Sequence, residues 1–454
     1  MKKILITILL LFFPVNLYAA TLEVGSGYAY ATIQAAVNAA VAGDTVLVYP
    51  GTYNESVRIP DSKQGTSTAP ITIKAQYPAR QPLDGGLWAN IVTNRSIINA
   101  SGTPSADGTP SNGDDFGIYN EQGPSQYAIS NIIIDGFYIQ NATDSGIYFT
   151  DDSYIWIKNN VIVDAGYNTT LGSENWGGIV LVRTGNSIVQ NNQVQLTSSG
   201  ASASGLFNLD GNAMIVEYNE CDLNTPSSGN GRCFYVRLSS VNSKYRYNYI
   251  NAASLANTQL ARFRDFTGLT LTNNYIYSSV AQNPFLIHEN DGPDSITENH
   301  NINNNTFYFA GGATSNVNIV SLGYITNSNV NNNILVSGIS DTLSCGYGRA
   351  YQSCNFGTSS PNSNLTIDST VYYNVTFIDN GECGSGNNCS PTNTQNTNPN
   401  ITAATGCAAS VDNSIYGANL NVSSIPYLKC DGTSYPIASG FGMPPSPPTS
   451  LSVQ

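Results

Sequence analysis

The stretch Ile157-Lys158-Asn159-Asn160-Val161-Ile162 contains the pattern that decides the fold. In this pattern an apolar residue is followed by two others, an asparagine, one further residue and a second apolar residue. The frame recurs around six more asparagines: Asn192, Asn219, Asn248, Asn274, Asn305 and Asn333. Phe137 takes the asparagine position in one earlier copy, and the mean spacing from 137 to 333 is 28 residues. A period of this length is typical of solenoids.

The residues around each asparagine favour strands over helices. Val, Ile and Tyr dominate, they alternate with polar residues, and neither a Leu-rich frame nor a 3.6-residue period is present. We therefore predict an all-β fold, a single-stranded right-handed parallel β-helix in which each coil contributes three short strands. An asparagine turned inward at the same corner of every coil could bond to its equivalents along the axis as a ladder. The alternative, that Asn-Asn pairs only mark surface turns, does not explain seven asparagines in one frame.

The two ends of the chain have different compositions. Residues 1–20 are typical of a secretory signal, with a basic start, an apolar run from 4 to 13, and Ala19 or Ala20 for cleavage. A membrane anchor is the alternative, but the run is too short to span a bilayer. We predict the β-helix over 21–378, with residues 32–40 forming an N-terminal capping helix.

Cysteines concentrate towards the other end. The chain has eight, an even number that favours disulfides in an exported protein. Cys345–Cys354, Cys383–Cys389 and Cys407–Cys430 are plausible short-range pairs, although the sequence does not settle the connectivity. We predict a Cys-rich C-terminal cap over 379–435 and a Pro/Ser-rich tail over 436–454.

The composition restricts the partners. Only 10% of residues are charged and the net charge is −13, which argues against nucleic acid as a ligand. A polyanionic substrate would need a local basic patch or a metal ion to overcome the overall repulsion. We expect a secreted or periplasmic monomer with no membrane span after removal of the signal.

Two segments carry a resemblance to a known superfamily. The segment from Tyr30 to Tyr53 (YATIQAAVNAAVAGDTVLVYPGTY) resembles the opening of pectin-lyase-like right-handed parallel β-helix proteins. The segment from Gly65 to Lys74 (GTSTAPITIK) is similar to a stretch in several secreted polysaccharide lyase families, including pectate and alginate lyases and chondroitinase B. The resemblance covers residues 22–378 and implies a carbohydrate-active protein. It does not identify one family, because no lyase, polygalacturonase or epimerase catalytic motif matches residue by residue.

This resemblance leaves two functions open. The first is binding and cleavage of an acidic polysaccharide by β-elimination. The alternative is a non-catalytic surface or extracellular protein that binds glycan in the manner of an adhesin. Which glycan is bound, whether the chain is catalytic, and whether it would act as a lyase or a hydrolase are not decided by the sequence.

The strand that follows the long variable turn of each coil should face the groove in this fold. Alternation then directs a set of polar side chains outward on neighbouring coils. We predict catalytic roles for Arg237, Arg264 and His288. We predict substrate binding by Asn208, Asp210, Tyr235, Arg262 and Trp176. The alternatives are that the arginines only pair with local acids, that the register is shifted by one residue, or that Trp176 anchors a loop.

Metal binding is a further hypothesis. Glu289, Asp291, Asp294 and Glu298 cluster after His288 and could hold Ca²⁺. A solvated acidic turn is the alternative, because no complete ligand loop is present.

Overall fold

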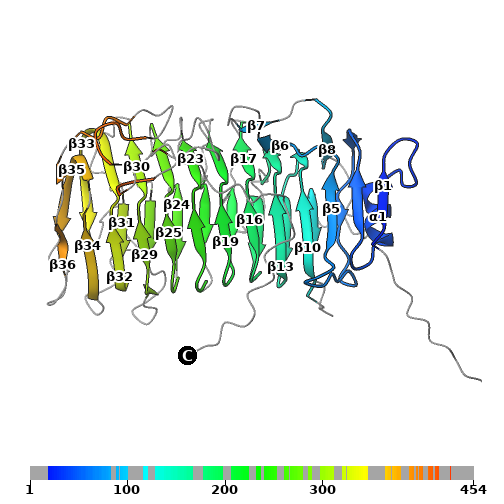
Figure 1. Ribbon diagram of the computed structural model, residues 1–454, viewed down its shortest axis with the longest axis horizontal. Coiled ribbons are helices and arrows are strands. Elements are labelled where there is room, and N and C mark those ends of the chain that lie inside the picture. The colour runs from blue at the N-terminus through cyan, green and yellow to red at the C-terminus, as the bar shows by residue number, and fades with distance from the viewer. Residues whose placement is uncertain are drawn as a thin grey trace, which may run out of the picture.

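Equivalent strands of successive coils stack in parallel along one long axis (Figure 1). This arrangement, seen in a computed structural model, confirms the predicted all-β parallel β-helix. The structure describes residues 19–82, 88–90, 93–100, 116–120, 128–166, 177–197, 206–223, 232–236, 240–252, 260–264, 266–279, 285–288, 297–310, 320–323, 325–345, 363–369, 371–379, 388–392, 395–396, 398–401, 407–412, 415–418 and 430.

The first row of strands forms a separate parallel sheet. It comprises β1 (Thr21–Val24), β2 (Thr45–Val48), β5 (Ile71–Ala75), β10 (Ser130–Asp135), β13 (Ser153–Lys158), β16 (Ile188–Gln190), β19 (Ile215–Glu217), β22 (Lys244–Arg246), β25 (Thr270–Thr272), β29 (Asn301–Asn303), β32 (Ile325–Asn331), β34 (Ser363–Asp368) and β36 (Asn388–Thr392). The short strand β28 (Thr297–Glu298) also pairs with β32.

The second row follows the first after a two-residue corner. It comprises β3 (Gly51–Tyr53), β8 (Ser96–Asn99), β11 (Tyr138–Gln140), β14 (Val161–Val163), β17 (Gln193–Leu196), β20 (Glu220–Leu223), β23 (Tyr249–Ala252), β26 (Tyr275–Ser278), β30 (Thr306–Phe309), β33 (Ile334–Cys345), β35 (Val371–Asp379) and β37 (Gln395–Asn396).

The third row completes each coil. It comprises β4 (Val57–Arg58), β9 (Ile118–Asn120), β12 (Ser145–Thr150), β15 (Gly177–Val182), β18 (Phe207–Leu209), β21 (Phe234–Val236), β24 (Ala261–Arg264), β27 (Phe285–His288) and β31 (Val320–Gly323). The long strand β33 pairs with both β30 and β31, so the second and third rows belong to one sheet.

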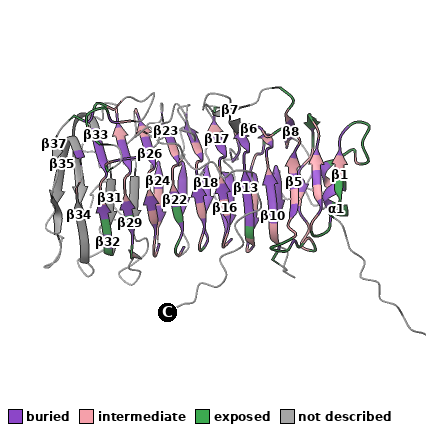
Figure 2. Cartoon of the chain, viewed as in Figure 1, coloured by how far each residue is buried: buried purple, intermediate pink, exposed green. Residues whose placement is uncertain are grey.

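The interior is a continuous apolar column. Alternate residues of each strand point inward and stack on their equivalents, as Ile134, Ile157, Val189 and Val216 do in the first row. Buried residues run through the stacked strands (Figure 2). Burial of this apolar column is the main stabilising contribution to a fold whose coils otherwise contact only their neighbours.

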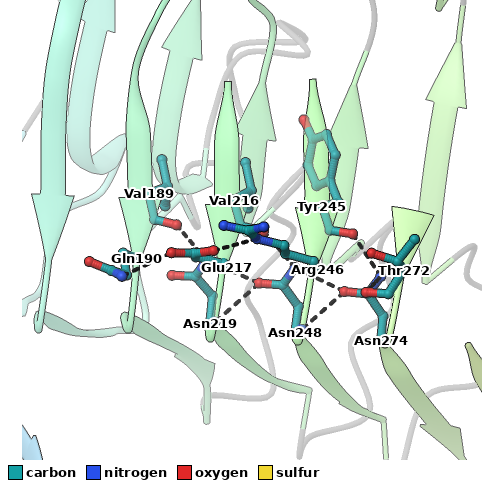
Figure 3. Close-up of polar contacts among 10 residues, drawn as sticks. All are labelled: Val189, Gln190, Val216, Glu217, Asn219, Tyr245, Arg246, Asn248, Thr272 and Asn274. Atoms are coloured by element: carbon teal, nitrogen blue, oxygen red, sulfur yellow. Dashed lines mark hydrogen bonds and ion pairs between the residues drawn. The ribbon is translucent and has the colours of Figure 1, made fainter. Parts of the chain in front are cut away.

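A row of buried asparagines follows the corner between the first and second rows. Each asparagine uses its side-chain amide to donate to the Oδ1 atom of the next, at 2.9 Å for Asn160–Asn192 and 3.1 Å for Asn192–Asn219. Figure 3 shows the same bonds further along the row, from Asn219 to Asn248 and from Asn248 to Asn274. The same Oδ1 atom also accepts the backbone N–H of the preceding asparagine, as in Asn192–Asn219 at 2.9 Å. The bonds continue through Asn248, Asn274, Asn305 and Asn333. These are the seven asparagines of the repeat frame.

The N-terminal end is closed by helix α1 (Ile33–Ala39), within the predicted range 32–40. Thr32 is the N-cap, and its hydroxyl accepts the Ala35 N–H at 3.2 Å. Glu55 accepts the N–H groups of Ile33 and Gln34 at 2.8 and 3.0 Å. Because the first turn of a helix leaves N–H groups unpaired, this carboxylate fixes α1 over the open core.

A short antiparallel hairpin, β6 (Arg80–Pro82) and β7 (Trp88–Asn90), leaves the stack after β5. The Arg80 N–H donates to the Asn159 carbonyl at 3.1 Å, its Nε donates to Asn191 at 3.2 Å, and its guanidinium pairs with Glu220 at 2.7 Å. Arg80 is 2% exposed. The backbone and side chain of this one residue therefore tie an early coil to three later ones.

Two disulfides lie among the described residues. Cys407–Cys430 is one of the pairs named from the sequence, whereas Cys221–Cys233 was not expected. The partners in the two other suggested pairs, Cys345–Cys354 and Cys383–Cys389, include residues outside the described part of the chain. Near Cys407–Cys430, the Ala418 N–H donates to Thr306 of β30 at 2.8 Å, so this C-terminal segment packs on the outer side of the second row.

The predicted signal, residues 1–20, lies almost wholly outside the described residues, as does the 436–454 tail. In the part of the chain that the structure describes, no helix is long and apolar enough to cross a membrane.

Candidate functional site

The third row brings several of the predicted site residues onto adjacent strands. Asn208 of β18 stands opposite Tyr235 of β21, and Tyr235 stands opposite Arg262 of β24. Arg264 stands opposite His288 of β27. Phe234 and Phe263 belong to the core, so the alternate positions point away from it. The register is therefore the one that alternation predicts.

The exposure of these residues differs from the expectation of an open groove. Asn208 and Tyr235 are fully buried and Asp210 is 1% exposed, whereas Arg262 and Arg264 are half-buried. Arg232 lies over the Tyr235 ring, with its guanidinium carbon 4.6 Å from the ring centroid. The tyrosine is covered because this arginine stacks on it, an arrangement that repeat periodicity alone does not reveal.

Arg232 is a site residue that the sequence predictions did not include. It immediately precedes Cys233, whose disulfide to Cys221 joins the start of the third-row strand to the second row. The guanidinium carbon of Arg262 lies 6.0 Å from the centroid of the Tyr235 ring. Two cationic side chains, Arg232 and Arg262, thus lie near one buried ring, and Arg264 follows two residues later on β24. Their clustering within 33 residues of a weakly charged chain was the available signal.

Asp210 is a buried carboxylate that directly follows β18. Burial raises the pKa of the core residue Tyr245 well above its usual value, and the charge of Asp210 raises it further. Nearby, Arg183 forms an ion pair with Asp151 and lowers the pKa of that carboxyl. Asp210 therefore acts electrostatically on its surroundings from beneath the surface.

Four predicted features cannot be placed in full. Arg237 and Trp176 lie outside the described residues, and only the backbone position of His288 is described. The proposed Ca²⁺ cluster falls largely in 289–296, which is also outside. Within the described ranges, no group of three or more His, Cys, Asp or Glu side chains could hold a metal ion.

The second histidine, His300, has a structural position. It is 1% exposed, and its Nδ1 atom accepts the Leu269 N–H at 3.3 Å. The backbone N–H of His300 donates to the Ser328 hydroxyl at 2.9 Å. Burial lowers the pKa of His300 to about 4. This imidazole is therefore neutral at neutral pH and fills a corner of the core.

A second polar cluster, on the outer side of the second row, was missed in the sequence. Glu220 and Asp222 alternate with Cys221 on β20, and Glu220 pairs with Arg80. Asp222 accepts amide N–H groups from Gln193 at 2.7 Å and from Asn251 at 3.2 Å. Burial and the charge of Glu220 raise the pKa of Asp222 to about 7. The alternation of two acids in Glu220-Cys-Asp222 was the only signal.

Comparisons with known proteins give only weak structural likenesses. No family model matches this chain, and no curated protein matches it. A complex of XylC with xylose is 11% identical, with a TM-score of 0.38 and coverage of 84% of this chain and 87% of XylC. A mannuronic acid specific polysaccharide family 6 lyase from human gut microbiota is 11% identical, with a TM-score of 0.41 and coverage of 80% and 84%. DFA-IIIase from Arthrobacter chlorophenolicus A6, in complex with DFA-III, is 11% identical, with a TM-score of 0.44 and coverage of 79% and 84%. Likenesses this weak do not bear on what the chain acts on.

Proposed function

We propose that this chain binds an acidic polysaccharide on the outer side of its third row and cleaves it by β-elimination. The observation that carries the proposal is the pair Arg262 and Arg264, two half-buried guanidiniums on one strand of a chain with a net charge of −13. A guanidinium matches a planar carboxylate through two parallel hydrogen bonds. The adjacent Arg232 adds positive charge where a uronate would lie.

The proposed reaction uses this charge directly. Guanidiniums from Arg264 and Arg237 neutralise the uronate carboxylate, which makes the C5 proton easier to remove. A base takes that proton, the electron pair forms a C4–C5 double bond, and the C4–oxygen bond breaks with proton transfer to the leaving oxygen. We assign the base to His288, because its strand position is opposite Arg264. Trp176 would stack on a neighbouring sugar.

The buried members of the predicted site take a supporting role in this proposal. Tyr235 supplies the ring on which Arg232 lies, and Asn208 stands beside it on the preceding coil. Asp210, at 1% exposed, would hold a nearby group in place without touching the sugar. We further propose that the protein is exported through residues 1–20 and acts as a monomer, with Ca²⁺ as a candidate cofactor.

A non-catalytic glycan-binding protein is the second candidate. The observation that favours it is the burial of Asp210, the described carboxylate of the outward column, which leaves it poorly placed to remove a proton from a sugar. The two candidates share the arginines and differ only in whether a base is present.

The test is the appearance of unsaturated uronate products. Alginate, pectate and glycosaminoglycans are incubated with the protein, with and without Ca²⁺, and ultraviolet absorbance is followed. Arg264→Ala should weaken uronate binding by about 1.5–3 kcal/mol, because a charged hydrogen bond is lost, and should reduce turnover further. Arg95→Ala, on the second-row side over Tyr138, is the matched control.

The outcomes separate the candidates. Product formation that Arg264→Ala abolishes and Arg95→Ala preserves supports cleavage at this site. Uronate binding without products on any substrate favours the non-catalytic candidate. Binding that Arg264→Ala and Arg262→Ala both leave unchanged would remove the site.

A further inference from the structure

The corner between the third and first rows turns through a left-handed residue in eight successive coils. Their φ angles lie between 50° and 68°. The residues are Asn131, Tyr154, Asn186, Ala213, Asn242, Gly268, Asn299 and Asn327. Asn and Gly tolerate this conformation, whereas a bulky side chain is disfavoured there. Two of the eight, Tyr154 and Ala213, are neither Asn nor Gly, and Tyr154 is the bulky one that needs an explanation.

The side chain of Tyr154 is exposed and stands at the edge of a groove on the outer side of the first row. It is 37% exposed, among the most exposed large apolar residues described. Trp156, Ile188 and Ile215, from three adjacent strands, line the groove with it. An unfavourable backbone conformation that keeps an aromatic ring at the surface is a reason to look for a ligand.

Polar groups at the same groove are available for hydrogen bonding. Asn131 and Asn186 line it beside Tyr154. Among the described residues, nothing bonds to the side-chain amide of Asn186. The indole N–H of Trp156 is buried and likewise has no described acceptor, although Lys158 lies 4.0 Å from its ring.

The charge of the groove differs from that of the third row. None of the described residues that line it carries a charged side chain. An uncharged concave surface with aromatic rings and amide groups suits a neutral ligand that has both apolar C–H faces and hydroxyls. A uronate carboxylate would find no cationic partner in this lining.

We propose that this groove binds a neutral sugar unit of a glycan, with the sugar ring stacked on Tyr154 and its hydroxyls bonded to the Asn186 amide. The groove lies on the first row, so it is separate from the arginines of the third row. It does not depend on the proposed cleavage, and a protein without lyase activity would bind sugar here equally well.

The test uses neutral oligosaccharides as probes. Xylo-, cello- and manno-oligosaccharides are titrated into the full chain, and binding is followed by calorimetry and by tryptophan fluorescence. Tyr154→Asn should lower affinity at least tenfold for the probe that binds. The same change should leave thermal stability equal or higher, because asparagine occupies this corner in other coils. A merely structural tyrosine would not separate binding from stability in this way.

Two further variants sharpen the result. Asn186→Ala should weaken binding several-fold, whereas Tyr77→Asn, at a tyrosine that is 43% exposed elsewhere, should not change it. Arg264→Ala should also leave neutral-sugar binding intact, which distinguishes this groove from the third-row site.

Three results would overturn the proposal: no probe binds the wild-type protein, Tyr154→Asn binds as well as wild type, or Arg264→Ala abolishes binding. Self-association that disappears in Tyr154→Asn, without sugar binding, would make the groove a contact between copies and would equally overturn it.

Discussion

The two corners on either side of the first row use different side chains to accept buried backbone N–H groups. The corner that leads to the second row uses asparagine in seven successive coils. The corner that arrives from the third row uses a mixed set of side chains to accept the N–H of the preceding coil. Its bonds run from Ile129 to Asp152, from Ile155 to Ser187, from Met214 to Ser243 and from Leu269 to His300.

The difference lies in how many bonds each corner makes. At the mixed corner one acceptor per coil is enough, so a hydroxyl, a carboxylate or an imidazole will serve. At the uniform corner the same side chain accepts from one coil through its oxygen and donates to the next through its nitrogen, because a carboxamide carries the acceptor and the donor on separate atoms. Uniform sequence therefore marks a corner where equivalent side chains bond to one another from coil to coil. Variable sequence marks a corner where each side chain bonds instead to the backbone of a neighbouring coil.

The largest effect should follow substitution in the uniform corner. Asn219→Ala removes the Oδ1 atom that accepts two hydrogen bonds from Asn192, one from its backbone N–H at 2.9 Å and one from its side-chain amide at 3.1 Å. Both donors stay buried and lose this acceptor. We expect a loss of about 3–5 kcal/mol, since each unsatisfied buried group costs about 1–3 kcal/mol. Urea unfolding followed by circular dichroism measures it. Asn329→Ala, at an exposed asparagine of the first row, should change stability by less than about 0.5 kcal/mol. Equal losses of stability in Asn219→Ala and Asn329→Ala would show that the buried asparagine corner is no more important than an exposed asparagine.

A pH-dependent effect should come from the mixed corner. The pKa of His300 is about 4 in the folded state, below the value of about 6.5 in an unfolded chain. As pH falls from about 6.5 to 4, the unfolded state binds the proton first, so the free energy of unfolding falls by up to about 3 kcal/mol. His300→Asn should remove this loss, measured as the difference from wild type at each pH. A constant difference across that range would contradict the assignment.

Asp222 provides a control of opposite sign. Its folded pKa of about 7 lies above that of an unfolded aspartate, so its contribution to stability falls as pH rises through the interval from about 4 to 7. The stability of Asp222→Asn relative to wild type should therefore increase towards neutral pH. The stability of His300→Asn relative to wild type should increase towards acidic pH. If the stabilities of both variants relative to wild type changed in the same direction with pH, the pKa shift of His300 or that of Asp222 would be wrong.

The smallest effect should be that of one hydroxyl in the mixed corner. Ser243 accepts the Met214 N–H at 3.0 Å and donates to the Gly211 carbonyl at 3.1 Å. Ser243→Ala leaves a single buried donor unpaired and should cost about 1–2 kcal/mol, measured by the shift in urea midpoint. A cost as large as that of Asn219→Ala would erase the contrast between the corners.

The interior of this protein follows from its sequence because a short rule repeats there. The asparagine frame fixes which residues turn inward, and strand alternation then places Asn208, Tyr235 and Arg262 on one side of the third row. Helix α1 follows from a local cap and an apolar face. Each of these inferences needs only neighbouring residues.

The outer surface does not follow in the same way, because its contacts join residues far apart in the chain. Alternation gave Tyr235 as outward but could not show that Arg232 covers it. The Cys221–Cys233 disulfide was hidden because Cys221 occupies an apolar position of the repeat frame. Burial between other coils is the largest cause of the raised pKa of Asp222, and its hydrogen-bond partners Gln193 and Asn251 also lie on other coils, which no local pattern connects to it.

The buried Arg80 has a consequence for the order in which the chain can fold. Its partner Asn191 lies 111 residues further along, and Glu220 lies further still. A chain that grows at about 5–20 residues per second takes on the order of ten seconds to extend that far. Until those coils exist, the ion pair with Glu220 and the hydrogen bond to Asn191 cannot form. The early coils must therefore wait in an unfinished state, and their completion is set by the arrival of later sequence as well as by their own contacts.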